Sequence, residues 1–387
     1  MQSRVPRIVS LPPGAGAVAL LADALRAPDG PIAPIPDEST VVSPTLRAAL
    51  LAAVDMTNPL PDDDTAVVLS TSGSTGEPKG VRHSRQALHV ATSALHERLG
   101  GAGDWVCALP LHSSAGFMTV ARAVLAGTQA FGCTSLGGAE SFTPAVFMAA
   151  SEQARNHGSG RRYISLVPAM AQRLLSDSLA LAELAAYDAV VIGGQAIPES
   201  VTATLREHQV AVVLSYGATE TCGGCVYDGL PLSGVQMNIT NSGQVQISGE
   251  VVMLGYRHEN SVSELSEIRG LRSFVMPDFG EIDAQGRLRI LGRADDVAVV
   301  NGVNVSLTAV ENVLTGVGID AVVCASDTRV FAVTSAPVAM AKVAHATSLV
   351  KDALAVRLDF RVVAEIPTNA SGKPDRQALL QHLAKGI

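Results

Sequence analysis

The chain has 387 residues, of which 47% are hydrophobic and 17% charged, and its formal net charge at pH 7 is −8. A chain of this length buries roughly three quarters of its unfolded surface and is expected to form two domains. The negative charge, without a basic stripe, argues against a nucleic-acid partner. No window reaches the 18 uninterrupted apolar residues of a membrane span. Five cysteines and the lack of a signal-peptide core favour reduced thiols and a cytoplasmic location.

Apolar runs alternate with helix-like segments over the first part of the chain. The run at 66–69 is followed by predicted strands at 105–109, 164–167, 189–192 and 211–214. Helical patterns occupy 85–99 and 200–208. This alternation predicts a mostly parallel, layered α/β body.

The pattern then changes to antiparallel β structure. We expect strands 245–248 and 251–255 to pair, and a second pair, 280–283 and 287–291, to flank the turn at 284–286. Beyond residue 295, strands are predicted at 297–300, 321–324, 330–333 and 361–364, with helices at 307–314 and 343–356 and a last short helix. These elements predict a small α+β domain at 295–387 after a large domain at 1–294.

A loop rich in glycine and hydroxyl groups follows the first of these apolar runs. Residues 70–80 read STSGSTGEPKG. Glycines let the backbone turn its N–H groups toward an anion, hydroxyls add donors, and Lys79 adds a compact positive charge. The Walker loop differs, because Ser or Thr follows its lysine, whereas Gly80 follows Lys79 here. A Gly/Ser linker is the alternative, but the Pro-Lys-Gly end behind a buried strand favours a phosphate-binding loop.

The loop resembles the signature of the adenylate-forming superfamily, which includes acyl-CoA ligases, luciferases and the adenylation domains of peptide synthetases. Further stretches match this family in its order along the chain: YGATE at 216–220, MPDFG at 276–280, GRADD at 292–296 and NASGK at 369–373. The resemblance implies a large domain, a small mobile C-terminal domain, and an enzyme that uses ATP, Mg²⁺ and CoA as co-substrate.

The resemblance also implies individual roles. The implied ATP-binding residues are Ser70, Thr71, Ser72, Gly73, Ser74, Thr75, Gly76, Lys79, Tyr216, Gly217, Thr219, Asp278 and Arg293. In the family the tyrosine stacks on adenine, the threonine touches the α-phosphate, the aspartate accepts the ribose hydroxyls, and the arginine points toward the ribose and phosphates. Glu220 is expected to hold Mg²⁺, Lys373 to be the adenylation lysine, and Asp295 to be the hinge.

The acyl substrate is expected beside the α-phosphate. The residues that match the family's pocket walls are His112, Ser113, Gly193, Gly194, Gln195 and Thr221. His112 is at a position that the family often fills with His or an aromatic residue, and is expected to gate or contact the substrate. No aspartate lies between residues 109 and 116, so an α-amino acid is not expected as substrate.

The stretch 216–232 and the compact length resemble the 2-succinylbenzoate:CoA ligases of menaquinone biosynthesis. Their acid carries a second carboxylate, which requires hydroxyl, amide or cationic partners. The sequence offers, without ranking them, Ser113, Ser114, Gln195, Thr221 and Arg122. Two other functions stay open: a ligase for another aryl or medium-chain acid, and a nucleotide-binding relative without catalysis. The oligomeric state is also open, a homodimer included.

Some stretches depart from the family pattern. Only 69 residues precede the loop, so the first domain is expected to be shortened at its N-terminus. Residues 301–304 read NGVN in place of the usual Gly-Gly-Glu-Asn near the pantetheine arm, where Asn301 and Gly302 are candidate CoA contacts. Residues 222–225 read CGGC, but no second Cys or His pair follows, so small residues packed beside the nucleotide are expected rather than a redox or zinc site.

Overall fold

The structure is a computed structural model of the chain. It describes residues 4–27, 29–71, 78–138, 140–258, 264–293, 296–301, 303–354, 356–367 and 374–384. Contacts group the chain into two compact units. The large unit comprises Met1–Asn238, Gln246–Val275 and Asp283–Leu288, and the small unit comprises Ile239–Val245, Met276–Ile282 and Arg289–Ile387.

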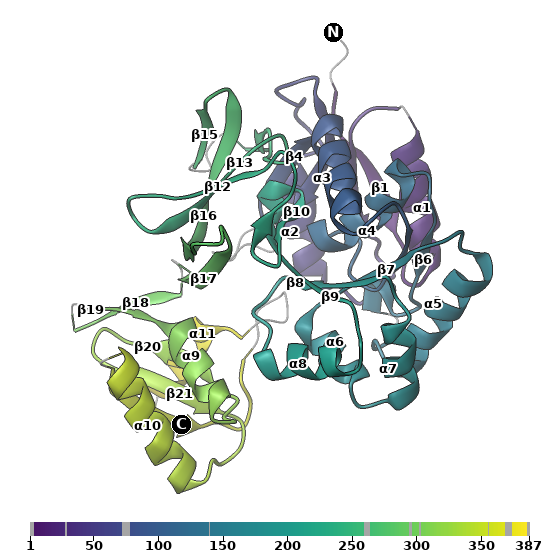
Figure 1. Cartoon of the computed structure of the whole chain (residues 1–387). Helices are drawn as coiled ribbons and strands as arrows, with labels where there is room; N and C mark the ends of the chain where they lie inside the picture. The colour runs from purple at the N-terminus through teal and green to yellow at the C-terminus, as the bar shows by residue number, and fades with distance from the viewer. Residues whose placement is uncertain are drawn as a thin grey trace. The chain divides into compact units, whose positions relative to one another are not determined.

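The first sheet of the large unit has the strand order β1-β2-β3-β4-β14. Strands β1 and β4 of this sheet are labelled in Figure 1. Its strands are β1 (Arg7–Leu11), β2 (Ile32–Pro36), β3 (Thr65–Ser70), β4 (Gly80–Ser84) and β14 (Gly255–Tyr256). The first three are parallel, β4 is antiparallel to β3, and β14 is antiparallel to β4. The predicted phosphate loop therefore joins two neighbouring antiparallel strands.

The second sheet has the order β11-β10-β9-β8-β7-β5-β6. Its strands are β5 (Asp104–Cys107), β6 (Ala130–Gly132), β7 (Arg162–Leu166), β8 (Ala189–Gly193), β9 (Val212–Ala218), β10 (Gly223–Tyr227) and β11 (Leu230–Pro231). Strands β5, β6, β7, β8 and β9 are parallel to one another, and β10 is antiparallel to both of its neighbours. This confirms the mostly parallel body and the strands predicted at 105–109, 164–167, 189–192 and 211–214 to within a few residues.

Helices separate most of these strands along the chain. They are α1 (Gly16–Arg26), α2 (Pro44–Val54), α3 (Arg85–Arg98), α4 (Ser114–Leu125), α5 (Pro144–His157), α6 (Pro168–Leu174), α7 (Ser178–Ala185) and α8 (Glu199–Glu207), with short 3-10 turns η1 (Leu136–Gly138) and η2 (Thr219–Thr221). Ser84 caps α3 and Ser113 caps α4, each accepting a hydrogen bond from a backbone N–H of the first turn. None of the described helices is long and apolar enough to cross a membrane.

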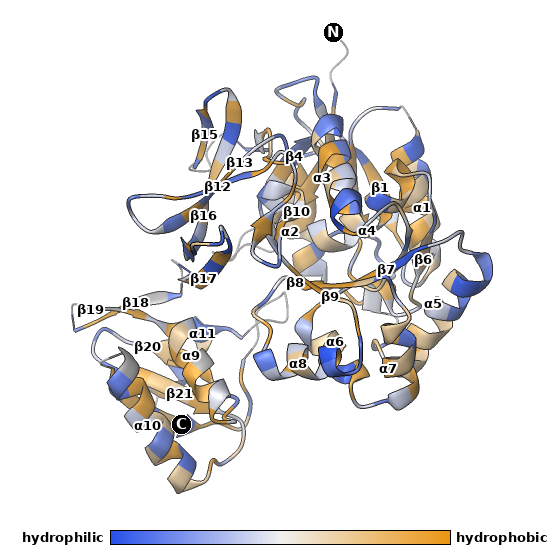
Figure 2. Cartoon of the chain, viewed as in Figure 1, coloured by the Kyte–Doolittle hydropathy of each residue, from blue (hydrophilic) through white to orange (hydrophobic). Residues whose placement is uncertain are grey.

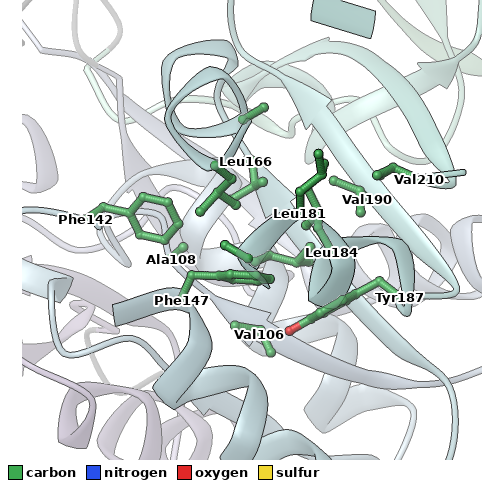
Figure 3. Packing of buried hydrophobic residues seen from close by; sticks show 14 of the residues in the cluster. Val106, Ala108, Phe142, Phe147, Leu166, Leu181, Leu184, Tyr187, Val190 and Val210 are labelled. Carbon is green, nitrogen blue, oxygen red and sulfur yellow. The ribbon is translucent and has the colours of Figure 1, made fainter. Parts of the chain in front are cut away.

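A large hydrophobic core lies between the parallel strands and the helices α5 to α8. Strands β5, β7 and β8 contribute side chains from one side, and the helices contribute Phe147, Leu181 and Leu184 from the other (Figure 3). Strand β8 is almost wholly hydrophobic (Figure 2), as expected for a parallel strand covered on both faces. This rigid layer carries the loops that follow β8 and β9.

Antiparallel strands follow the second sheet. They are β12 (Gln236–Ile239), β13 (Gln244–Ser248), β15 (Leu265–Ile268), β16 (Leu271–Ile282) and β17 (Leu288–Arg293), in the order β12-β13-β16-β15 with β17 on β16. The pairing of β16 with β17 around the turn at 284–286 is as predicted. The predicted strand 251–255 is wrong, because residues 251–254 form no strand and only Gly255 enters one, which pairs with β4.

The described residues in the C-terminal part of the small unit form two further sheets and three helices. Its elements are β18 (Val297–Val300), β19 (Val303–Ser306), α9 (Leu307–Gly316), β20 (Val322–Ala325), β21 (Val330–Thr334), α10 (Met340–Leu354), β22 (Leu358–Val362) and α11 (Arg376–Ala384). The fully buried Val310, Leu314 and Val350 join helices α9 and α10 to the three-stranded sheet. All predicted elements of this segment are present, and β19 is additional. Whether the boundary between moving domains is at residue 295 stays a prediction.

Candidate active site

Two hydrogen bonds between Thr71 and Lys79 close the base of the predicted phosphate loop. The N–H of Thr71 donates to the carbonyl of Lys79 at 2.8 Å, and the N–H of Lys79 donates to Oγ1 of Thr71 at 3.0 Å. Ser70 is buried at the end of β3, and its hydroxyl has no hydrogen-bond partner among the described residues. Predicted contacts of this loop that lie outside the described residues are Ser72, Gly73, Ser74, Thr75 and Gly76.

Strand β9 is the least covered of the interior strands of the second sheet. All seven of its residues are partly exposed, although hydrogen-bonded strands flank it on both sides. A central parallel strand is normally covered on both faces. Tyr216 lies on this strand, and Gly217 follows where a Cβ would stand 2.0 Å from the carbonyl oxygen of Gly223. The open strand therefore presents the predicted adenine-binding residue on an accessible surface.

The turn after β9 brings two predicted residues, Thr219 and Glu220, close to residues from other elements. Oγ1 of Thr219 donates to Oγ of Ser114 at 3.2 Å, at the start of α4. The hydroxyl of Tyr256 donates to Oε1 of Glu220 at 2.9 Å, and Nζ of Lys79 lies 4.9 Å from the centre of the Tyr256 ring. Tyr256 thus joins the phosphate-loop lysine to the predicted metal ligand.

Sequence reasoning missed Tyr256, which lies 36 residues beyond Glu220 on the short strand β14. Burial, together with the neighbouring Glu220 carboxylate, raises the pKa of Tyr256 far above its usual range. The phenol therefore keeps its proton and acts as a donor to the carboxylate.

The geometry of Glu220 suits Mg²⁺ held jointly with a nucleotide. Among the described residues no group of three or more His, Cys, Asp or Glu side chains could hold a metal ion by itself. Mg²⁺ commonly binds one or two carboxylates, water and substrate phosphates. One oriented carboxylate beside a lysine of the predicted phosphate loop fits that mode, in which Mg²⁺ would neutralise phosphate charge.

Several predicted substrate residues serve the local fold. The Ser113 hydroxyl caps α4 by accepting from the N–H of Gly116, and it donates to the carbonyl of Pro110. Thr221 is fully buried, and its hydroxyl bonds Ala218 and Gly223 within the turn. Gly193 ends β8, and Gly194 and Gln195 follow it as exposed residues.

His112 lines a small apolar groove in the large unit. The groove has a volume of about 290 Å³, and this volume includes space that is open to solvent. Its other walls include Leu11, Pro36 and Leu136. Burial lowers the pKa of His112 to about 4, so the ring is neutral at pH 7. A neutral ring suits a contact or gating role.

Arg122 is a buried cation whose contacts are all with neutral groups in the described part of the chain. Its side chain is on α4, and the residue is only 4% exposed. One Nη donates to the hydroxyl of Tyr227 at 3.1 Å, and the guanidinium lies 5.0 Å from the centre of the Trp105 ring. Its Nε has no hydrogen-bond partner there. A buried guanidinium in this state favours an anionic ligand.

The position of Arg122 relates it to the Glu220 turn. Ser114, Met118 and Arg122 are spaced four residues apart on α4 and so share one face. Ser114 meets Thr219, and a Cβ at Gly223 would lie 3.7 Å from Cγ of Met118. Arg122 therefore lies about 12 Å along the helix from Ser114, on the face that packs against β10.

In the small unit, Asp278 and Arg293 form an ion pair. Asp278 on β16 is 6% exposed, and its Oδ1 accepts from an Nη of Arg293 on β17 at 3.5 Å. The pairing of β16 with β17 places both side chains together. Asp295 and Lys373 lie outside the described residues, so their predicted roles depend on the sequence resemblance alone.

Arg376 connects the segment after residue 295 to the last helix. Its guanidinium pairs with Asp296, donates to both carboxylate oxygens of Glu311 at 3.0 and 3.1 Å, and donates to the carbonyl of Val323 at 2.9 Å. The carboxylate of Asp296 also accepts from the hydroxyl of Thr308 at 2.9 Å. This group, named the Arg376 cluster, joins parts of the chain up to 80 residues apart.

The candidate CoA residue Asn301 lies in the tight turn between β18 and β19. Its φ of 50° is in the left-handed region. The backbone N–H of Asn301 donates to Asp327, and its side chain donates to the carbonyl of Thr328. Asn-Gly is the preferred pair for such a hairpin turn, a signal that could have predicted β19. Gly302 is outside the described residues.

The two cysteines of the CGGC segment are not joined by a disulfide. Cys222 and Cys225 are both fully buried free thiols. Burial raises the pKa of Cys225 to about 12, so this thiol is protonated. The glycines between them begin β10, beside the Glu220 turn, so both cysteines belong to the framework of the candidate site.

Comparison with known proteins gives consistent relatives. A family model for AMP-binding enzymes matches residues 15–257. A probable 2-succinylbenzoate–CoA ligase of Mycobacterium tuberculosis is 35% identical over 387 residues, covering 96% of this chain and 97% of that protein. A 2-succinylbenzoate–CoA ligase of Enterococcus faecalis is 28% identical, over 69% of this chain and 58% of the relative.

Solved structures share the fold at lower identity. The o-succinylbenzoate CoA synthetase of Bacillus subtilis, in complex with its acyl-adenylate intermediate, superposes with a TM-score of 0.77 at 22% identity over 97% of this chain and 88% of that one. A Klebsiella oxytoca protein in complex with 3-hydroxyanthranilyl-AMSN has the same TM-score at 17% identity over 98% and 90%. The two structures hold molecules with different acyl groups and match this chain equally well, so the fold alone does not indicate which acid is the substrate.

Proposed function

This chain belongs to the family of AMP-binding enzymes, and we propose that it is the AMP-forming ligase that joins 2-succinylbenzoate to CoA in menaquinone biosynthesis. A carboxylate oxygen of the acid attacks the α-phosphorus of ATP and pyrophosphate leaves. The thiol of CoA then attacks the carbonyl of the acyl-adenylate, and AMP leaves. Support for the activity comes from the M. tuberculosis relative, whose similarity extends over nearly the whole chain.

The large unit supplies groups suited to the first step. Lys79 at the loop, Thr219 beside the α-phosphate and Glu220 as the Mg²⁺ ligand would reduce the repulsion between two anionic substrates. In the small unit, Asp278 is assigned to the ribose hydroxyls and Arg293 to the ribose and phosphates. These assignments extend the sequence resemblance to residues whose local geometry is compatible with them.

The choice of acid is carried by Arg122. 2-Succinylbenzoate has two carboxylates, and only one of them reacts. A buried guanidinium with neutral neighbours and an unpartnered Nε is suited to the second, ring carboxylate. Of the five candidates named from the sequence, Ser113 and Thr221 already bond the local backbone, and Arg122 is the one that carries a charge.

The proposal is tested by incubating the purified chain with ATP, Mg²⁺, CoA and one acid at a time. With 2-succinylbenzoate we expect pyrophosphate, AMP and the CoA thioester, at a kcat/KM at least about a hundredfold above that for benzoate or octanoate. Equal turnover of octanoate would favour the medium-chain alternative. Absence of pyrophosphate with every acid would favour a nucleotide-binding protein without catalysis.

Tyr256→Phe tests the Mg²⁺ assignment of Glu220. A hydrogen bond to a charged group contributes about 1.5–3 kcal/mol, and this variant removes only the hydroxyl. We expect the Mg²⁺ concentration for half-maximal pyrophosphate release to rise about tenfold. Tyr187→Phe is the matched control, because its hydroxyl bonds Ser151 in the core. An unchanged Mg²⁺ requirement in Tyr256→Phe would contradict the assigned role of this contact.

A further inference from the structure

A buried pair of side chains lies directly against the Glu220 turn and has no part in the proposed chemistry. His83 on β4 and Cys222 at the end of the turn are both 0% exposed. Nε2 of His83 is 2.6 Å from the carbonyl oxygen of Thr219, and its Nδ1 is 3.2 Å from Sγ of Cys222. Both ring nitrogens of His83 are therefore engaged within the turn.

The chemistry of the partners fixes the direction of both hydrogen bonds. A carbonyl oxygen only accepts, so Nε2 of His83 carries the hydrogen and donates to Thr219. Burial lowers the pKa of His83 to about 4, which leaves the ring neutral and its Nδ1 an acceptor. The thiol of Cys222 must then donate its S–H to Nδ1. Two hydrogen bonds therefore follow one another, the first donated by Cys222 to His83 and the second donated by His83 to Thr219.

These two hydrogen bonds end at the peptide group that precedes Glu220. The carbonyl of Thr219 belongs to the Thr219–Glu220 peptide, so the hydrogen bond from His83 fixes the plane of that peptide. The next peptide is held separately, because the carbonyl of Glu220 accepts from the N–H of Met253 at 2.8 Å. Cys222 itself has a φ of 54°, in the left-handed region that non-glycine residues rarely occupy. The turn is thus fixed on both sides of Glu220.

We propose that His83 and Cys222 are positioning residues that hold the Thr219–Glu220 peptide so that the Glu220 carboxylate points toward the nucleotide-bound Mg²⁺. The inference rests on the proposed role of Glu220 in ATP binding, and it assigns a function to a histidine and a cysteine that touch no substrate. Tyr256 orients the carboxylate end of the side chain, whereas this pair orients the backbone from which the side chain begins.

The test measures ATP binding by calorimetry at a series of Mg²⁺ concentrations, without any acid. His83→Leu removes both hydrogen bonds, whereas the amide of His83→Gln can still donate to Thr219. We expect the Mg²⁺ concentration that gives half of the gain in ATP affinity to rise at least about tenfold in His83→Leu and to stay within about threefold in His83→Gln. ATP affinity without Mg²⁺ should change little in either variant.

A second pair of variants addresses Cys222 and avoids loss of the buried ring. Cys222→Ala removes the donor to Nδ1, and Cys222→Ser restores one, while both keep the Cβ in the left-handed conformation. We expect about a threefold rise in the Mg²⁺ requirement for Cys222→Ala and a value near wild type for Cys222→Ser. If His83→Leu does not fold, this comparison decides the proposal.

The possible outcomes are distinguishable from failure of the proposed function. An unchanged Mg²⁺ requirement in folded His83→Leu, or in Cys222→Ala, would overturn the positioning role. A lower unfolding midpoint with unchanged Mg²⁺ dependence would likewise reduce the pair to a packing role. Because ATP binding needs no acid, a wild-type protein that binds MgATP but does not activate 2-succinylbenzoate would contradict the proposed substrate and leave this inference standing.

Discussion

Arg122→Met is expected to abolish the selection of the dicarboxylic substrate. The wild-type chain should turn over 2-succinylbenzoate at least about a thousandfold more efficiently than 4-phenyl-4-oxobutanoate, which lacks only the ring carboxylate. A site built to bond a polar group can reject the analogue lacking it by roughly 10⁴-fold, whereas an apolar pocket discriminates far less. In Arg122→Met the ratio of the two kcat/KM values should fall to about tenfold or below, through loss of activity on the dicarboxylate.

Arg122→Lys is the matched variant, because it keeps the charge but loses the forked geometry, and its ratio should lie between the other two. The unfolding midpoint of Arg122→Met should not fall markedly, since replacing a buried charge by an apolar side chain of similar volume is often neutral. A thousandfold preference that survives in folded Arg122→Met would remove Arg122 from the carboxylate site. Equal kcat/KM values for the two acids in the wild type would instead point to a general aryl-acid ligase.

Lys373→Ala should separate the two half-reactions. Removing one preorganised charge donor commonly lowers a rate by 10²–10³, so formation of the acyl-adenylate should slow by about a hundredfold or more. Formation of the thioester from synthetic acyl-adenylate and CoA should stay within a fewfold of wild type, because the resemblance assigns Lys373 to adenylation alone. Single-turnover assays of each step measure both quantities.

Lys351→Ala is a suitable control for this experiment. Lys351 is an exposed lysine on α10, in the same unit as Lys373, and its loss should leave both steps unchanged. Equal losses of adenylation and thioester formation in Lys373→Ala would contradict the division of labour between the half-reactions. It would also weaken the case for a hinge at Asp295.

The sequence predicted backbone structure well where hydrophobic runs are bounded by loops. The predicted bounds 297–300 are those of the observed strand, and the predicted bounds 189–192 and 330–333 differ from the observed strands by one residue. The failure at 251–255 has a physical cause: Val251, Val252 and Met253 are all 0% exposed, yet none of them lies in a strand. An apolar run reports burial, and burial is compatible with more than one backbone conformation.

The candidate site could be predicted only in part for a different reason. Motif residues such as Glu220 lie in short stretches whose composition carries a signal. Tyr256 is 36 residues from Glu220 in the sequence, and His83 is 136 residues from Thr219, although both contact the same turn. Neither residue has a local sequence pattern that distinguishes it from a core residue. Arg122 could be named from the sequence but not ranked, because its distinguishing property is burial without a charged partner.

Because of the Arg376 cluster, the structure of the small unit depends on the presence of the last helix. Arg376 is the first residue of α11, and Leu379, in the same helix, is fully buried against the small sheet. A chain cut before Arg376 would leave Asp296 and Glu311 as partly buried carboxylates without their shared cation, and their mutual repulsion would loosen the segment that follows residue 295. Proteolysis or a premature stop before Arg376 should therefore disturb the segment that follows residue 295, although 80 residues of sequence separate Asp296 from Arg376.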